Sequence, residues 1–86
     1  MRVSINVYMD LAGKLGWSRR DLNIDKDKVT FKEVLSELRD LWNTIISNLD
    51  EYLILVNGVN IKLLRGLETE IYSDVTIDIF PPAGGG

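Results

Sequence analysis

The residues best suited to covalent chemistry lie at the C-terminal end of the sequence, Pro81-Pro82-Ala83-Gly84-Gly85-Gly86. Glycine has no side chain to exclude it from a narrow channel, and it adopts backbone angles that are closed to other residues. The two prolines lack N–H donors and favour an extended chain, so they should end a preceding strand and stiffen its exit. We therefore interpret residues 81–86 as a flexible tail that carries the terminal carboxylate of Gly86 into a partner's cleft.

The carboxylate of such a tail must be activated before it can react. A free α-carboxyl group has an ordinary pKa of about 3.5, so at neutral pH it is an anion and a poor electrophile. Adenylation by ATP converts one oxygen into a leaving group, after which an amine, a thiol or a sulfur donor can take the acyl group. A separate enzyme would have to supply that step. Glycine-rich ends are also common as disordered termini or remnants of cloning, and this alternative stays open from the tail alone.

The composition excludes several function classes. The chain contains neither cysteine nor histidine, so it lacks a thiol nucleophile, a soft metal ligand and the usual neutral-pH base. We therefore expect neither a self-sufficient enzyme nor a metal site. The net charge is −3, and the one basic cluster, Arg19-Arg20, is followed by Asp21, so nucleic acid is not an expected partner.

The sequence also gives no sign of membrane targeting. Nothing at the N-terminus resembles a signal peptide, and the longest apolar run, residues 53–56, is far too short to span a bilayer. We expect a cytoplasmic protein that has no membrane partner.

A length of 86 residues with 45% hydrophobic residues predicts one domain with a single core, which we place at residues 1–80. Apolar and polar residues alternate over residues 2–9, with Met9 on the apolar face, and again over residues 21–25. These patterns predict a hairpin of two strands, joined by a loop that contains Gly13 and Gly16.

A capping box marks the start of one helix. The Thr30 hydroxyl can accept from the Glu33 amide while the Glu33 side chain reaches back, and Val29 and Val34 are spaced as a hydrophobic staple. Apolar residues then recur at spacings of three and four, which predicts an amphipathic helix with one apolar face. They are Val34, Leu35, Leu38, Leu41, Trp42, Ile45 and, at the end of the series, Leu49.

Three further strands are predicted after the helix. Residues 52–56 form the first, Asn57-Gly58 favours a tight turn into a brief strand at residues 59–61, and residues 75–80 alternate cleanly as the last strand. The segment 62–74 is irregular, with one helical turn near Leu67.

The resulting order, ββαβββ, predicts an α+β fold in which a five-stranded mixed sheet packs on one main helix. Adjacent, parallel first and last strands would make this the β-grasp arrangement typical of ubiquitin-like domains. That step is an analogy, because pattern alone does not fix strand order.

Phe80 is the first candidate for contact with a partner protein. Its alternation with the apolar residues of the last strand places it on the face away from the helix, beside the exit of the tail. Tyr8 on the neighbouring strand is expected to join it. Ordinary packing at the edge of the sheet is the alternative for Phe80.

Other residues are less promising as sites. Three carboxylates that could be imagined as a paired acid or metal site fall at turns and on a solvated face, so we expect them to be hydrated. They are Asp10, Asp74 and Asp78. Trp17 and Trp42 are interpreted as core or loop-packing residues.

Over essentially its whole length the sequence resembles the MoaD family, the small sulfur-carrier subunit of molybdopterin synthase. Members typically close with an apolar strand, Phe-Pro-Pro, two variable small residues and Gly-Gly, and residues 79–86 have the same length and pattern. Residues 55–58 resemble the family's Val-Asn-Gly turn, and residues 72–76 resemble its Gly-Asp-Val step. The loop at residues 10–16 departs from the family's Ala-x-x-Arg pattern and offers only Lys14 as a basic substitute.

The resemblance implies a division of labour between several proteins. An E1-like (MoeB-like) adenylyltransferase would use ATP to adenylate Gly86, and a sulfur donor protein would convert the product to a thiocarboxylate. A MoaE-like large subunit of the synthase would then bind the tail while sulfur passes to a pterin precursor. The protein itself would be non-catalytic and bind no cofactor. Because the chain has no cysteine, any sulfur it carries must be held on the carbonyl of Gly86.

Three other functions remain open from the sequence. The same tail chemistry serves a ubiquitin-like modifier whose Gly86 is joined to lysines of target proteins. A sulfur carrier of the thiazole pathway is closer in function to a MoaD-like carrier than a modifier is, although the tails of such carriers usually lack the Pro-Pro step. The last alternative is a binding module with an inert tail.

Overall fold

The computed structural model describes residues 1–82. The strands are β1 (Arg2–Val7), β2 (Arg19–Asn23), β3 (Val29–Thr30), β4 (Leu53–Val56), β5 (Val59–Asn60), β6 (Glu70–Ile71) and β7 (Val75–Phe80). The α-helices are α1 (Met9–Leu15), α2 (Phe31–Ser36) and α3 (Arg39–Ile45), and the 3₁₀ helices are η1 (Ile46–Glu51), η2 (Ile61–Leu63) and η3 (Gly66–Glu68).

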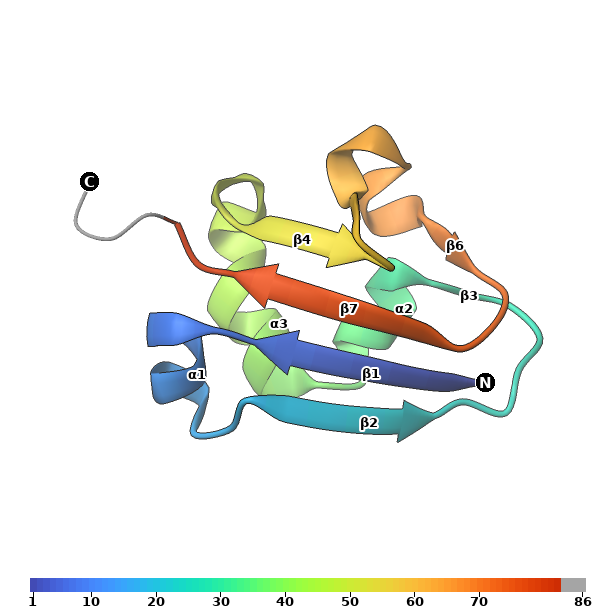
Figure 1. Ribbon diagram of the computed structural model, residues 1–86, viewed down its shortest axis with the longest axis horizontal. Coiled ribbons are helices and arrows are strands. Elements are labelled where there is room, and N and C mark those ends of the chain that lie inside the picture. Colours follow the sequence, from blue (N-terminus) through green and yellow to red (C-terminus); the bar gives the residue numbers. More distant parts are fainter. Residues whose placement is uncertain (83–86) are drawn as a thin grey trace.

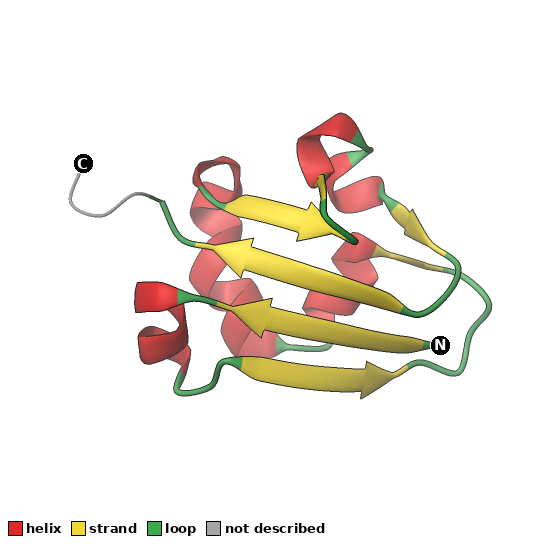
Figure 2. Ribbon diagram, viewed as in Figure 1, coloured by secondary structure: helices red, strands yellow, loops and turns green. Residues whose placement is uncertain are grey.

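Five strands form a mixed sheet in the order β2-β1-β7-β4-β5. The two central strands, β1 and β7, run parallel, and Val3, Ile5 and Val7 lie opposite Val75, Ile77 and Ile79. The β1–β2, β4–β7 and β4–β5 pairs are antiparallel. Helices α2 and α3 cover one face of this sheet (Figures 1 and 2). The predicted hairpin and the predicted parallel pairing of first and last strands are confirmed, and the architecture is an α+β β-grasp fold.

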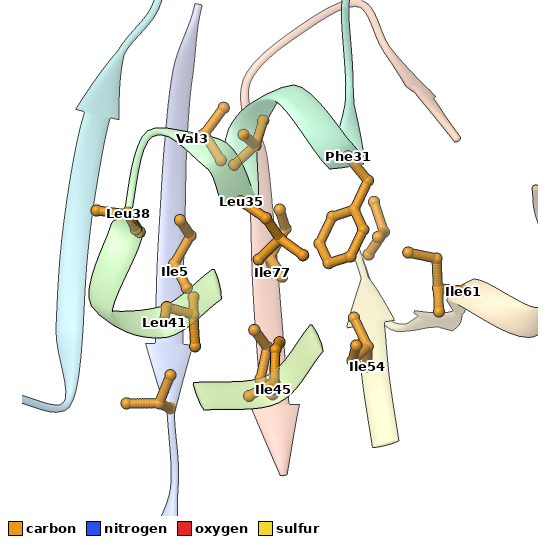
Figure 3. Packing of buried hydrophobic residues seen from close by; sticks show 14 of the residues in the cluster. Val3, Ile5, Phe31, Leu35, Leu38, Leu41, Ile45, Ile54, Ile61 and Ile77 are labelled. Atoms are coloured by element: carbon orange, nitrogen blue, oxygen red, sulfur yellow. The ribbon is translucent and has the colours of Figure 1, made fainter. Parts of the chain in front are cut away.

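The core lies between the sheet and the helical segment. Every second residue of the central strands points toward the helices, because side chains alternate between the two faces of a strand. Figure 3 shows this packing: the helical segment contributes Phe31, Leu35, Leu38, Leu41 and Ile45, and the strands contribute Val3, Ile5, Ile54 and Ile77. All of these side chains are buried, so the core fixes β7 against the helical segment.

The capping box is present as predicted, and the main helical segment that it starts packs on the sheet, but this segment is interrupted once. The Glu33 amide donates to Thr30 Oγ1, and the Thr30 amide donates to Glu33 Oε1, each over 3.2 Å. Val29 and Val34 of the predicted staple are both buried. The helix then breaks at Leu38 (φ −115°, ψ 83°) and divides into α2 and α3. Leu38 remains buried across the break. The apolar spacing therefore predicted the burial of Leu38 correctly, but it did not predict where the helix is interrupted.

The segment after β1 was predicted to be strand and then loop, and this was wrong. Met9 has a φ of 54° and is 76% exposed, so the strand ends before it and Met9 is not on the buried face. Residues 9–15 form α1, which is anchored by buried Leu11. Gly16, with a φ of 82°, ends this helix and donates its N–H to the Ala12 carbonyl. The two glycines suggested a loop, yet Gly13 lies within the helix and only Gly16 requires the left-handed conformation.

The region after β4 combines confirmed and missed features. Asn57 and Gly58 have φ values of 49° and 82°, as the predicted tight turn requires. Leu67 lies in the short helix η3, as expected. Strand β6 was missed, because its two residues pair with the two-residue strand β3 and neither is long enough to show alternation. Among residues 1–82, no helix is long and apolar enough to cross a membrane.

Candidate functional site at the end of the central strands

The two central strands end at the same edge of the sheet, next to α1 (Figure 1). Tyr8 directly follows β1, and Phe80 is the last residue of β7. The Tyr8 amide donates to the Ile79 carbonyl over 3.2 Å, which extends the parallel pairing by one residue. Parallel strands bring residues far apart in the sequence to one edge, so the start and the end of this chain jointly form this surface.

Tyr8 and Phe80 form an aromatic pair at this edge. Their ring centroids are 4.2 Å apart and their planes differ by 7°. Such stacking contributes about 0.5–1.5 kcal/mol beyond the area that it buries. Leu53, the residue of β4 opposite Phe80, is 44% exposed and extends the apolar surface across the next strand. The expectation that Tyr8 joins Phe80 is confirmed, although Tyr8 lies just past the strand; a role for the pair in binding remains a prediction.

A carboxylate anchors the tyrosine of this pair. The Tyr8 hydroxyl donates to Asp78 Oδ1 over 2.6 Å, and Asn6 Nδ2 donates to the same oxygen over 3.1 Å. The hydrogen bond to Asp78 raises the pKa of the Tyr8 phenol above 10.0, because ionisation would remove the donated proton. Sequence reasoning missed this contact. A signal for it was present in the sequence: Asp78 is two positions from Phe80 and Asn6 is two positions from Tyr8, so alternation places each pair on one face of its predicted strand.

The three carboxylates considered as an acid or metal site do not gather. Asp10 lies in the first turn of α1, Asp74 accepts from the Arg2 amide over 2.7 Å, and Asp78 binds Tyr8. Within the described residues, no three potential ligands among Asp, Glu, His and Cys lie close enough together to hold a metal ion.

The first residues of the tail continue from the aromatic pair. Pro81 and Pro82 belong to no helix or strand, and Pro81 is partly buried while Pro82 is exposed. The predictions on Ala83, Gly84, Gly85 and Gly86 concern residues outside the described range.

A second aromatic side chain is held by a carboxylate elsewhere in the fold. Trp17 Nε1 donates to Asp40 Oδ2 over 2.8 Å, and the Arg20 guanidinium lies 4.5 Å from the centre of the Trp17 ring. Arg20 also forms an ion pair of 3.6 Å with Asp40. The pKa of the Asp40 carboxyl is lowered below 3.8, chiefly by the hydrogen bond that it accepts from Trp17. We call these three residues the Trp17 cluster; Trp17 is confirmed as a loop-packing residue, and Trp42 packs against the core.

The fold defines a ubiquitin-like β-grasp protein. The chain belongs to the ThiS family, because the model of that family matches residues 7–86. It is therefore a member of the superfamily of ubiquitin-like sulfur carriers that includes ThiS and MoaD. The match includes the four residues beyond the described range.

Individual relatives agree with this assignment. A protein of Archaeoglobus fulgidus that is provisionally named a sulfur carrier is 31% identical over 74 residues, covering 77% of this chain and 84% of the relative. The solution structure of small archaeal modifier protein 1 from Methanosarcina acetivorans is 28% identical, with a TM-score of 0.72 over 99% of this chain and 96% of that one. The crystal structure of SAMP1 from Haloferax volcanii has a TM-score of 0.80 over the whole of both chains at 20% identity, which shows the shared fold.

Proposed function

We propose that this protein carries sulfur on the C-terminal carbonyl of Gly86 for the synthesis of molybdopterin. The observation that supports this proposal is the family match that runs to residue 86, on a chain that has no cysteine to carry sulfur in another way. The Phe80-Pro81-Pro82 step at the end of β7 is the feature that favours the molybdopterin pathway among sulfur carriers, through the resemblance to MoaD. The proposal places the protein in the cytoplasm.

The chemistry requires two steps on the carboxylate of Gly86. The carboxylate oxygen attacks the α-phosphorus of ATP, which forms an acyl-adenylate and releases pyrophosphate. Hydrosulfide, or a protein that delivers sulfur at the same oxidation level, then attacks the acyl carbon. The C–O bond to AMP breaks, AMP leaves with the electron pair, and a thiocarboxylate remains. The E1-like enzyme supplies the nucleotide site, and this chain supplies the acyl group.

Affinity for such partners should come from the folded surface beside the tail. Ordering a glycine backbone costs on the order of 1–2 kcal/mol per residue, so a threaded tail binds weakly by itself. Phe80, the last residue of β7, directly precedes Pro81, and the Tyr8 ring stacks on it from just past the end of β1. We propose that this pair docks on the E1-like enzyme and on the MoaE-like large subunit, while residues 81–85 are threaded toward the catalytic site. In protein interfaces a few aromatic residues near the centre usually contribute most of the binding free energy.

Mass spectrometry tests the activation. The full chain is incubated with the E1-like enzyme of the same organism, ATP and sulfide, and intact and peptide masses are then measured. We expect one oxygen of Gly86 to be replaced by sulfur, and we expect no such change without ATP. A chain that ends at Gly84 is the matched control, since it lacks both residues of the proposed Gly85-Gly86 acyl donor, and its mass should not change. An unchanged mass for the complete chain would contradict the proposal and favour an inert binding module.

A second assay tests the pathway. The purified thiocarboxylate is mixed with the MoaE-like subunit and the pterin precursor, and formation of the sulfur-containing pterin is followed. Transfer of sulfur to the pterin supports the molybdopterin role. Transfer only to a thiazole precursor by the corresponding enzyme would assign the carrier to that pathway instead.

Protein modification is a second candidate function. The observation that favours it is the 28% identity to the small archaeal modifier protein 1 of Methanosarcina acetivorans. In this case an amine replaces hydrosulfide as the nucleophile that displaces AMP, and an isopeptide bond forms between Gly86 and a lysine. Peptide masses from a reaction with cell extract distinguish the two: branched peptides in which a lysine carries the C-terminal residues up to and including Gly86 identify a modifier. Their absence, with thiocarboxylate present, identifies a dedicated sulfur carrier.

A further inference from the structure

One member of the Tyr8–Phe80 pair also makes a hydrogen bond to a third residue, Asp78. The Tyr8 hydroxyl is anchored on Asp78 Oδ1 over 2.6 Å, and its ring is stacked on Phe80. Hydrogen bonds to a carboxylate are shorter and stronger than those between neutral groups. A tyrosine that is stacked on one side and anchored at its hydroxyl keeps little rotational freedom.

Two central strands of the sheet build this arrangement. Asn6 lies opposite Asp78 in the parallel pairing of β1 and β7, and Val7 lies opposite Ile79. Val7 and Ile79 are buried among the core residues. Because side chains alternate along a strand, Asn6, Tyr8, Asp78 and Phe80 all belong to the opposite face. Asn6 donates to the same oxygen of Asp78, so the carboxylate is itself fixed by the neighbouring strand.

The strand ends at Val7, and the backbone changes direction immediately after Tyr8. Met9 has a φ of 54°, which is uncommon for a residue with a side chain, and its side chain is 76% exposed. Tyr8 therefore has no following strand residue to support its ring on that side. Asp78 supplies the support from the strand that also carries Phe80.

We propose that Asp78 is a positioning residue of the docking surface: it keeps Tyr8 stacked on Phe80, so that the activating enzyme meets a preformed apolar patch of Tyr8, Phe80 and Leu53. The partner that this patch fits has an apolar recess beside the channel that receives the tail. The inference rests on the proposed function, because it assigns a role to Asp78 in the docking that precedes activation of Gly86.

Preorganisation acts on binding and leaves the chemical step alone. A side chain that must be immobilised in the complex costs free energy there, and one that is already fixed in the free protein does not. Asp78 contacts Tyr8 and Asn6, and the reacting atoms belong to Gly86. Loss of the anchor should therefore raise the KM of the activating enzyme for this carrier and leave kcat unchanged.

Four variants of the full chain test the role of Asp78 in ATP-dependent adenylation. Asp78→Ala removes both the charge and the acceptor, whereas Asp78→Asn removes the same charge and keeps an acceptor oxygen. Tyr8→Phe keeps the ring and removes the donor. We expect Asp78→Ala and Tyr8→Phe to raise KM by about threefold to tenfold, Asp78→Asn by less than about twofold, and the double variant Tyr8→Phe/Asp78→Ala no more than either single change.

A measurement on the free carrier makes the test independent of the enzyme. Nuclear Overhauser contacts between the rings of Tyr8 and Phe80 should be present in the wild type and in Asp78→Asn, and weakened in Asp78→Ala. Thermal unfolding of each variant checks that it is folded. Tyr8→Phe changes one oxygen atom only, so it serves if Asp78→Ala does not fold.

The possible results separate the two proposals. Failure of the wild type to be adenylated would reject the proposed function. Adenylation of the wild type with unchanged KM in both Asp78→Ala and Tyr8→Phe would reject the role of Asp78 alone. An equal rise in KM for Asp78→Asn and Asp78→Ala would also overturn it, because charge and not anchoring would then be responsible. So would ring contacts that persist unchanged in Asp78→Ala.

Discussion

Two aromatic side chains of this protein are held by aspartates, and the two arrangements have different consequences. The Trp17 cluster joins the α1–β2 connection and β2 to helix α3 through Trp17, Arg20 and Asp40. The anchor of Tyr8 joins β1 and β7, which are already paired over five residues. The first arrangement ties separate elements together, whereas the second fixes a side chain on a surface that the backbone has already built. The same chemistry therefore ties elements together in one place and, in our proposal, shapes the docking surface in the other.

The largest expected effect comes from removing residues that belong to neither arrangement. Deletion of Gly85 and Gly86 should abolish ATP-dependent activation, because it removes the proposed acyl donor. The free energy of unfolding should change by less than about 0.5 kcal/mol, because among residues 1–82 every residue of the core precedes residue 80. Pyrophosphate exchange and chemical denaturation measure the two quantities, and Ala83→Ser is the matched control with both glycines retained. A large loss of stability on deletion would show that the tail is part of the folded body.

Breaking the Trp17 cluster should affect stability and leave activation intact. Asp40→Ala removes the acceptor of Trp17 Nε1 and the partner of Arg20. We expect the free energy of unfolding to fall by about 1–2 kcal/mol, since the side chain of Asp40 is partly exposed and water replaces some of the lost contacts. Urea unfolding gives this value, and KM for the activating enzyme should stay at that of the wild type. A raised KM would mean that the Trp17 cluster also shapes the docking surface.

Breaking the aromatic pair should show the opposite pattern. Phe80→Ala removes the partner of the Tyr8 ring and the centre of the apolar patch, and we expect KM to rise by about tenfold, as at other aromatic anchors. The free energy of unfolding should fall by about 1 kcal/mol, because the stacking is lost while the core is untouched. Leu64→Ala serves as a control, since Leu64 is an exposed apolar residue that lies outside β1, β4 and β7. Equal KM values for the two variants would argue for ordinary edge packing of Phe80.

The smallest expected effect is the pH dependence of the Trp17 cluster. The pKa of Asp40 lies below 3.8 in the folded protein, chiefly through the hydrogen bond from Trp17. The unfolded chain therefore binds the proton more readily, so the contribution of Asp40 to stability is present above pH 3.8 and is lost as the pH falls through the folded-state pKa. The difference in free energy of unfolding between the wild type and Asp40→Asn should therefore become smaller as the pH falls below 3.8. Urea unfolding over a series of pH values measures it, and a constant difference would contradict the assignment.

The predicted parts of the fold are those with a strong local signal. The capping box at Thr30, the turn at Asn57 and the alternation of β7 each follow from a few adjacent residues, and all are present. Helix α1 and the break at Leu38 were not predicted. Strand β1 ends where Met9 adopts a positive φ. No local sequence pattern predicts a positive φ in a residue such as methionine. At Leu38 the apolar spacing continues while the backbone departs from the helix.

The sequence predicted the two aromatic residues of the candidate site, but it did not predict the hydrogen bonds that hold them. Alternation placed Phe80 on the outer face, and Tyr8 was expected beside it. The anchor on Asp78 and the Trp17 cluster were missed, because each joins residues far apart in the sequence. Tyr8 and Asp78 are 70 positions apart, and Trp17 and Asp40 are 23 apart. Such contacts follow from strand order and helix placement, and pattern alone fixes neither.

The sequence by itself determined the chemical possibilities of this protein. The absence of cysteine and histidine removes the common nucleophile and base, and the run of prolines and glycines marks the one segment that suits activation by another enzyme. Tertiary structure alone decided what surrounds that segment. The parallel pairing of β1 and β7 brings Tyr8, Asp78 and Phe80 to one edge, because adjacency in a sheet is set by packing across the whole core and not by neighbouring residues.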